Sequence, residues 1–197
     1  MRKVLIALFL LSIAYALFVV SYAEEVSNMR KAVMIIAQND FRDEEFLRPK
    51  ELLEKAGFEV KVASTSLDLA KGMLGAAVKP EILINDINVR DFRAIIFVGG
   101  AGASQYWDNP VAHKLAQDAL LADKIVAAIC IAPVTLAKAG ILSGKRATVW
   151  ASEADQIKDG GANYTARPVE KDGNIITASG PAAATEFGEA LVRALNQ

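Results

Sequence analysis

One cysteine and one histidine occur in the 197 residues of this chain. A single cysteine cannot form a disulfide within the chain, and with one histidine it cannot supply the four ligands of a tetrahedral zinc site. The sequence also lacks an excess of either charge, because 23 acidic residues balance 22 basic residues. It has no basic stripe of the kind that binds nucleic acid. We therefore expect neither a metal site nor a nucleic-acid partner.

The N-terminal segment differs in composition from the rest of the chain. Arg2 and Lys3 precede an uncharged, mostly apolar stretch, residues 4–23, which ends in Ser21-Tyr22-Ala23. This pattern is typical of a secretory signal peptide, residues 1–23, here followed by a linker, residues 24–28. An uncleaved anchor is the alternative, because a membrane-spanning helix needs ~20 apolar residues. Either way we predict one exported domain, periplasmic or extracellular, at residues 29–197, with membrane contact only through the leader.

Apolar runs of strand length alternate with segments of helix length. Continuous apolar runs are typical of strands that are buried on both faces of a parallel sheet. The predicted strands are residues 31–37, 58–64, 94–98, 125–129, 147–150, 162–165 and 175–178. One predicted helix is capped by Asp43, carries Pro49 in its early part and ends before Gly57, and three more span 110–122, 133–139 and 181–195. The alternation predicts an α/β fold with an open parallel sheet covered on both faces. We expect residues 67–89 to form an excursion from this alternation, such as a hairpin or an edge pair of strands.

Three features follow predicted strands at the carboxyl edge of the sheet, where ligands bind in such folds. The first is Cys130, which ends an apolar strand and precedes a helix by three residues. A helix N-terminus lowers the pKa of a thiol and favours the thiolate, which indicates a nucleophile elbow. The alternative is a buried, inert cysteine that packs as a small hydrophobe.

The other two features are the pair Gly99-Gly100 and the acidic cluster Asp43-Glu44-Glu45. The glycines let backbone N–H groups approach a ligand or an oxyanion, although most such glycines only form a tight turn. The acids either complement the helix dipole or provide an acid/base group for the thiol. Spacing alone does not decide which acid would do so.

The remaining chemically distinctive side chains have simpler interpretations. His113 is expected to be an exposed surface histidine, which leaves Cys130 without a histidine base in its own chain. The aromatic residues Trp150, Tyr106 and Trp107 either line a pocket or pack in the core or an interface.

Five segments resemble the ThiJ/PfpI superfamily over residues 29–197. They are DEEFLRP (43–49), IFVGGAG (96–102), AAICIAP (127–133), VEKDGNI (169–175) and SGP (179–181). The resemblance implies a flavodoxin-like three-layer α/β/α sandwich with a mostly parallel sheet and a cysteine nucleophile elbow. It also implies a homodimer or a higher homo-oligomer and no cofactor.

The family's functional residues transfer to single positions of this sequence. The resemblance makes Cys130 the nucleophile and Glu45 the acid/base, with Gly100 and Ile131 supplying backbone amides that face the sulfur. Gly99, Ala101 and Trp150 then belong to the pocket. Protease-like members of the family have histidine directly after the cysteine, where this chain has Ile131, and deglycase-like members often place a histidine near Trp150.

The close approach of a thiol and a carboxyl has an electrostatic consequence. An ionised Glu45 raises the pKa of Cys130 by like-charge repulsion, whereas the helix N-terminus lowers it. We expect the two groups to titrate as a coupled pair with one shared charge, a thiolate beside a protonated Glu45.

The first functional hypothesis is a glyoxalase-III-like or deglycase-like enzyme that acts on reactive 2-oxoaldehydes or their adducts. The second is a redox sensor or stress-response chaperone in which Cys130 is oxidised. A cysteine peptidase is disfavoured because Ile131 replaces the histidine base. A pocket that binds a metabolite or partner without chemistry is the fourth hypothesis.

Overall fold

A computed structural model of the chain describes Tyr15, Val19 and residues 30–197. The predicted leader, residues 1–23, and linker, residues 24–28, lie outside the described residues except at Tyr15 and Val19. None of the helices in the described part of the chain has both the length and the apolar character needed to cross a membrane.

A seven-stranded sheet forms the centre of residues 30–197, with the strand order β11-β12-β8-β7-β1-β3-β6. Its strands are β1 (Lys31–Ile35), β3 (Glu59–Ser64), β6 (Ile82–Leu83), β7 (Ala94–Phe97), β8 (Ile125–Ile129), β11 (Val169–Asp172) and β12 (Ile175–Ala178). Neighbouring strands are parallel except for β11 and β12, which are antiparallel. The predicted mostly parallel sheet is therefore confirmed.

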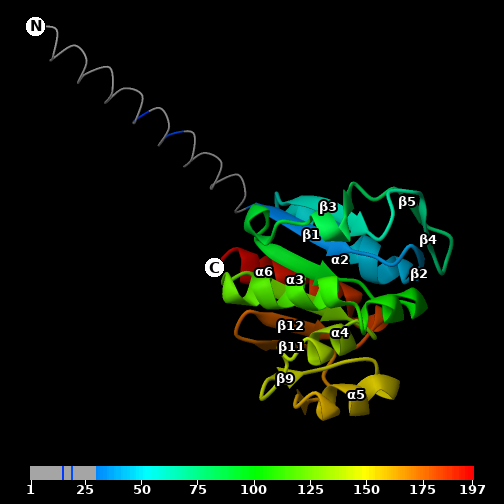
Figure 1. Cartoon of the computed structure of the whole chain (residues 1–197), viewed down its shortest axis with the longest axis vertical. Helices are drawn as coiled ribbons and strands as arrows, with labels where there is room; N and C mark the ends of the chain where they lie inside the picture. Colours follow the sequence, from blue (N-terminus) through cyan, green and yellow to red (C-terminus); the bar gives the residue numbers. More distant parts are fainter. Residues whose placement is uncertain (1–14, 16–18, 20–29) are drawn as a thin grey trace, which may run out of the picture.

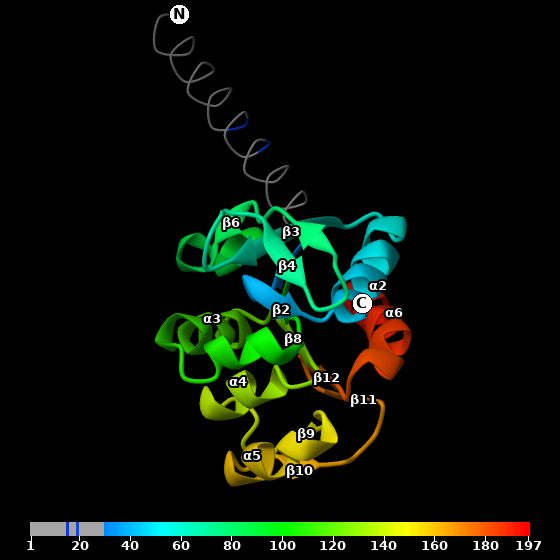
Figure 2. The same cartoon turned by 90° about the vertical axis from the view of Figure 1, so that its right-hand side faces the viewer.

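Helices cover both faces of this sheet. Helices α2 (Asp43–Lys55) and α6 (Ala184–Leu195) pack against each other on one face, and α3 (Pro110–Leu121) and α4 (Pro133–Lys138) lie on the other (Figure 2). Strand β1 shows why both faces must be covered. Its residues alternate between two hydrophobic cores, with Val33 and Ile35 on one side and Ala32 and Met34 on the other. The three layers confirm the flavodoxin-like sandwich.

The predicted excursion contains more structure than a hairpin. Strands β4 (Ala70–Gly72) and β5 (Ala77–Val78) form the antiparallel pair, and β2 (Asn39–Phe41) joins β4 to make a small second sheet (Figure 1). The chain then adds β6 to the edge of the main sheet and continues through two short 3-10 turns, η1 (Ile84–Asp86) and η2 (Val89–Asp91). Strand β6 has two residues, too few for a detectable alternating pattern.

Most predicted helices and late strands are present with shifted bounds. The pair β9 (Arg146–Ala147) and β10 (Asn163–Tyr164) is shorter than predicted, with α5 (Ala154–Asp159) and the 3-10 turn η4 (Ala151–Glu153) between its strands. The last helical segment begins with a 3-10 turn, η5 (Pro181–Ala183), before α6. Antiparallel β11 was missed as a strand because only Val169 in it is apolar.

Helix α2 differs from the prediction at its first turn. Arg42 is the N-cap residue, and Asp43 is the first helical residue, so the predicted Asp43 cap is wrong. Pro49 lies inside the helix, six residues after its start. Gly57 adopts the predicted left-handed conformation after the helix, with φ +84°. This early start places all three acids of the cluster on the first helical turn.

The order of β8, β7 and β1 in the sheet brings the three predicted features together. These strands are adjacent and parallel, so their carboxyl ends meet at one edge. Cys130 directly follows β8, and one residue separates the end of β7 from Gly99-Gly100. Strand β1 leads through β2 into α2.

Candidate active site

Cys130 occupies a sharp turn between β8 and α4. Its backbone is left-handed, with φ +64°, which costs a non-glycine residue about 1–2 kcal/mol. Two backbone hydrogen bonds hold it there: its N–H donates to the carbonyl of Ala178 (2.9 Å), and its carbonyl accepts from the N–H of Trp150 (2.8 Å). The side chain is 9% exposed. The structure thus shows a left-handed cysteine at the strand-to-helix turn that the sequence predicted.

Neither Gly99 nor Gly100 has room for a side chain, because Gly99 lies against this elbow and Gly100 against the β2–α2 turn. A Cβ at Gly99 would overlap the Glu45 carboxyl and the Cβ of Cys130, and one at Gly100 would overlap the backbone of the β2–α2 turn. Gly100 also has φ +98°. The N–H of Gly100 lies within hydrogen-bonding reach of the Cys130 sulfur, and so does the N–H of Ile131.

The three acids of the cluster have three different partners. Asp43 accepts the N–H groups of Leu74 (2.8 Å) and Ala76 (2.7 Å), and so holds the β4–β5 hairpin against α2. Glu44 forms a two-point ion pair with Arg42. Glu45 is fully buried and faces the sulfur of Cys130 and the backbone N–H of Gly99. Neither Glu45 oxygen has a hydrogen bond of regular geometry to any residue that the structure describes. Glu45 is therefore the acid placed to exchange a proton with the thiol.

Burial changes the acidity of both groups. It raises the pKa of Glu45 to about 8, against smaller lowering effects from Cys130 and from the charge of Arg42. Burial and the charge of Glu45 raise the pKa of Cys130 to about 12, against the lowering effect of the Gly100 and Ile131 amides. The expected lowering of the thiol pKa by the helix is therefore wrong in its net direction. Helix α4 has only six residues, and desolvation of the sulfur outweighs it.

A small pocket of about 200 Å³ opens over the pair. The predicted site residues Glu45, Gly100, Ala101, Cys130, Ile131 and Trp150 line it, together with Arg42, Met73 and Pro181. Of the predicted residues, Gly99 lies behind Glu45 and Cys130 instead of at the pocket wall. Sequence reasoning missed the other three. Arg42 and Pro181 belong to the segments next to the predicted site, whereas Met73 comes from the excursion and carries no sequence signal.

Trp150 forms the apolar rim of the pocket and is 47% exposed. Its ring lies directly over Gly180, where an added Cβ would stand 2.6 Å from the Cε3 atom. Gly180 has φ +149°, so this close stacking depends on glycine twice, for space and for conformation.

The other singled-out side chains lie behind the elbow. Tyr106 is buried, and its hydroxyl donates to the carbonyl of Ile36 (2.8 Å). Trp107 donates its indole N–H to the carbonyl of Ile131 (3.1 Å). His113 is half-buried, not exposed as predicted, because its Nε2 bonds the Trp107 carbonyl (2.7 Å). His113 is therefore engaged with Trp107 and does not line the pocket at Cys130.

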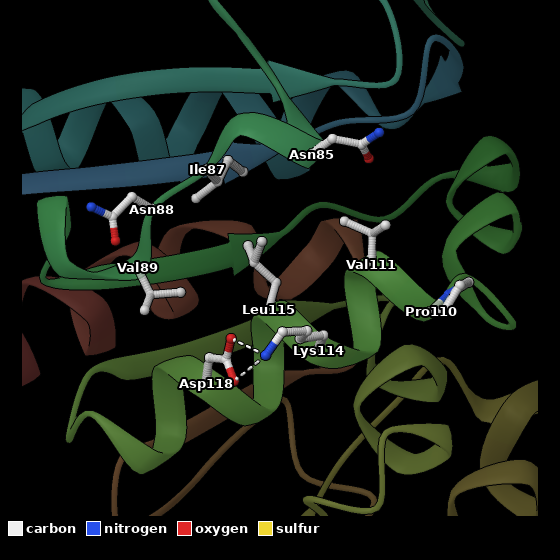
Figure 3. Close-up of a pocket in the computed structure, with 9 residues that line it drawn as sticks. All are labelled: Asn85, Ile87, Asn88, Val89, Pro110, Val111, Lys114, Leu115 and Asp118. Atoms are coloured by element: carbon white, nitrogen blue, oxygen red, sulfur yellow. Dashed lines mark hydrogen bonds and ion pairs between the residues drawn. The ribbon is translucent and has the colours of Figure 1, made fainter.

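A larger hollow of about 470 Å³ lies elsewhere, between the η1–η2 segment and α3 (Figure 3). Its walls are mainly apolar, with Ile87, Val89 and Leu115 facing it, and the charge of Lys114 is taken by Asp118 (2.8 Å). It contains no nucleophile or buried acid, so the chemically equipped pocket is the smaller one. Among the residues that the structure describes, no three side chains of histidine, cysteine, aspartate or glutamate are grouped as metal ligands would be.

A flavodoxin-like sandwich with a left-handed cysteine at a strand-to-helix elbow and a buried carboxyl beside it defines a class of α/β proteins with a cysteine-centred pocket. The chain belongs to the DJ-1/PfpI family, whose sequence model matches residues 30–194.

Relatives cover most or all of the chain. The protein MJ0967 of Methanocaldococcus jannaschii is 40% identical over 100% of this chain and 98% of its own length. Deglycase PfpI of Pyrococcus furiosus is 29% identical over 76% of this chain and 90% of its own. The glutathione-independent glyoxalase DJR-1.2 of Caenorhabditis elegans is 28% identical over 84% of this chain and 89% of its own.

A solved structure shows the same fold. The ThiJ/PfpI domain protein of Brachyspira murdochii superposes with a TM-score of 0.83 at 34% identity, covering 85% of this chain and 96% of that one. The family and the fold expected from the sequence are therefore confirmed.

Proposed function

We propose that this protein is a cysteine-dependent, cofactor-free enzyme that acts on small 2-oxoaldehydes such as methylglyoxal, or on their adducts. Relatives named deglycase and glyoxalase support enzymatic activity of this kind. The observation that carries the proposal is the content of one pocket of about 200 Å³. It combines a thiol, a buried carboxyl whose pKa is about 8, and two backbone amides directed at the sulfur.

The proposed reaction begins at the aldehyde carbon. The sulfur of Cys130 forms a bond to this carbon, Glu45 accepts the thiol proton, and the carbonyl oxygen becomes an oxyanion held by the Gly100 and Ile131 amides. Protonation of this oxygen by Glu45 gives a hemithioacetal. Glu45 then takes the former aldehyde proton from the first carbon and returns it to the neighbouring carbon, while the hydroxyl proton passes to the ketone oxygen through the enediol, which yields a thioester. Water cleaves the thioester, so methylglyoxal plus water becomes lactate plus one proton, and the free thiol returns.

The protonation state of the pair fits both roles of Glu45. With a pKa of about 8, the carboxyl holds a proton at neutral pH and gives it up readily. A general acid and base works best when its pKa lies near the working pH. Loss of the first proton, from Glu45, leaves a carboxylate that can accept the thiol proton, and this singly charged pair is the reactive form.

The test measures lactate formed from methylglyoxal without glutathione, using the purified full chain. Wild type should form lactate, and Cys130→Ala and Glu45→Gln should not. Glu54→Gln is the matched control, because Glu54 lies on the same helix with its carboxylate on Lys50 at the surface. Lactate formation that survives Cys130→Ala would exclude the proposed nucleophile.

Oxidation sensing is the second candidate, and one observation favours it. The Glu45 oxygens have no regular hydrogen bond to any described residue, so a protonated Glu45 has a donor available for a sulfinate on Cys130. The chain has no second cysteine to resolve a sulfenate as a disulfide. If wild type forms no lactate but peroxide converts Cys130 to the sulfinate and changes the melting temperature, this function replaces the first.

Peptidase activity has less support. Ile131 stands where protease-like members have histidine, and His113 bonds Trp107. Cys130-dependent cleavage of casein would overturn this judgement.

For the N-terminus we propose export directed by residues 1–23, with anchoring by residues 4–23 as the alternative, and for the domain a homodimer or a higher homo-oligomer. N-terminal sequencing of the exported protein tests cleavage before Glu24. Light scattering tests assembly, and a monomer at all concentrations would contradict it.

A further inference from the structure

The two amides that face the Cys130 sulfur come from different loops. Gly100 is the N-cap residue of the 3-10 helix η3 (Ala101–Tyr106) in the connection between β7 and α3, whereas Ile131 follows the cysteine in the connection between β8 and α4. Both N–H groups lie close enough to the sulfur to lower the pKa of the thiol. Two donors can stabilise one oxyanion only when their separation is fixed before the reaction, so something must hold the two loops in register.

Trp107 connects these two loops. It directly follows η3, and its backbone N–H donates to the carbonyl of Ser104 (3.1 Å). Its indole N–H crosses to the other loop and donates to the carbonyl of Ile131 (3.1 Å). The same carbonyl accepts a longer bond from the N–H of Val134 (3.3 Å) at the start of α4. Of these two hydrogen bonds to the Ile131 carbonyl, the indole bond is the shorter, and it is the one whose donor comes from the other loop.

Trp107 is itself held on two sides. His113 donates from Nε2 to the Trp107 carbonyl (2.7 Å), and a carbonyl can only accept, so the proton of this tautomer is on Nε2. The ammonium of Lys138 lies 6.0 Å from the centre of the indole ring and pairs with Asp108 (2.8 Å). The His113 bond therefore fixes the backbone of Trp107, and the Lys138 ammonium lies on one side of its ring.

We propose that Trp107 is a positioning residue for the reaction at Cys130, and that its indole N–H sets the distance between the Gly100 and Ile131 amides. The inference rests on the proposed function, because it assigns the two amides to the oxyanion. Trp107 is not among the residues that line the pocket. In this proposal it acts through the backbone of Ile131, whose carbonyl it fixes one residue after the turn at Cys130.

Trp107→Phe is the direct test, because it removes the N–H donor and keeps an aromatic ring. The kcat for methylglyoxal should fall about 10- to 100-fold, since a misplaced oxyanion donor weakens the transition state, while KM changes less than about threefold. Tyr106→Phe is the matched control. It removes a neighbouring hydrogen bond of similar length, from the Tyr106 hydroxyl to the carbonyl of Ile36, which is not one of the amide donors. Its kcat should stay within about twofold of wild type.

A second readout does not depend on turnover. The Ile131 amide lowers the pKa of the thiol, so displacing it should move the pH midpoint of Cys130 alkylation upward. Trp107→Phe should show this shift, and Tyr106→Phe should not. If Trp107→Phe fails to fold, His113→Ala and His113→Gln replace it. The alanine variant should shift the midpoint in the same direction by less, and glutamine, which keeps a donor, should restore it.

The outcomes separate the two proposals. Wild-type kcat and an unshifted midpoint in Trp107→Phe would overturn the positioning role, as would equal losses of kcat in Trp107→Phe and Tyr106→Phe. Absence of lactate from wild type would remove the proposed function instead, and the alkylation midpoints would still decide whether Trp107 positions the Ile131 amide.

Discussion

Replacing Glu45 by glutamine should remove a pH dependence from the stability of the protein. Burial raises the pKa of Glu45 from 4.5 to about 8 in the folded state. Between these values the folded protein keeps a proton that the unfolded chain releases. The contribution of Glu45 to stability is therefore fully present below about pH 4.5 and is lost as the pH rises through about 8.

The slope of this effect follows from counting one proton. Each pH unit in the window lowers the free energy of unfolding by about 1.4 kcal/mol. Between about pH 5.5 and about pH 7.5 the free energy of unfolding should therefore fall by roughly 3 kcal/mol. For a urea m-value of about 2 kcal/mol per molar, the unfolding midpoint should fall by roughly 1.4 M over this range. Cys130 does not contribute in this window, because its pKa is raised from 9.0 to about 12.

Urea unfolding at several pH values measures this slope for wild type, Glu45→Gln and Glu54→Gln. Glutamine has the shape of a protonated carboxyl but does not titrate, so Glu45→Gln should lose the slope and become more stable than wild type as the pH rises. Glu54→Gln should keep the wild-type slope, because Glu54 is exposed on the same helix. Parallel pH profiles for wild type and Glu45→Gln would refute a protonated, buried Glu45.

Three shorter predictions follow from other contacts. Alkylation of Cys130 by iodoacetamide should be faster in Glu45→Gln than in wild type above about pH 8, because the ionised Glu45 of wild type raises the thiol pKa and glutamine carries no charge; equal rates would contradict the coupling. Gly180→Ala should lower the free energy of unfolding by about 1–3 kcal/mol and alter tryptophan fluorescence, because its Cβ meets the Trp150 ring; wild-type stability and emission would count against this packing. Asp43→Ala should expose the β4–β5 hairpin to proteolysis, because two hairpin amides lose their acceptor; an unchanged cleavage rate there would show that the acid is dispensable.

The parts of the fold that the sequence predicted are those encoded by local patterns. Residues 94–98 and 125–129 are continuous apolar runs, and both contain buried parallel strands, β7 and β8. Strand β6 has only two residues, and its place in the sheet is decided by pairing with β3. Short strands of this kind depend on a partner far along the chain, which no local periodicity reports.

The acids show the same limit at the site. Asp43, Glu44 and Glu45 are adjacent and chemically alike, so their spacing could not assign their roles. Their contacts distinguish them. Asp43 binds hairpin amides 31 and 33 residues further along the chain, and Glu44 pairs with Arg42. Glu45 faces Cys130 in the turn after β8. Family resemblance selected Glu45 where spacing could not, and the structure shows the contact with Cys130. The resemblance did not predict that burial raises the pKa of the thiol by more than the helix N-terminus lowers it.

Unfavourable features are concentrated at this pocket. Cys130 has a left-handed backbone, Glu45 is a fully buried acid without a regular hydrogen bond among the described residues, and Gly99 leaves no room for a side chain. The first two would be relieved by an ordinary substitution, such as glycine at the cysteine or leucine at the acid. Strain and buried ionisable groups persist only where the surrounding structure enforces them, and they cluster where chemistry is done. All three features lie at Cys130, so on the proposed function their cost would be the cost of a catalytic thiol, and the stability gained by Glu45→Gln should accompany a loss of turnover.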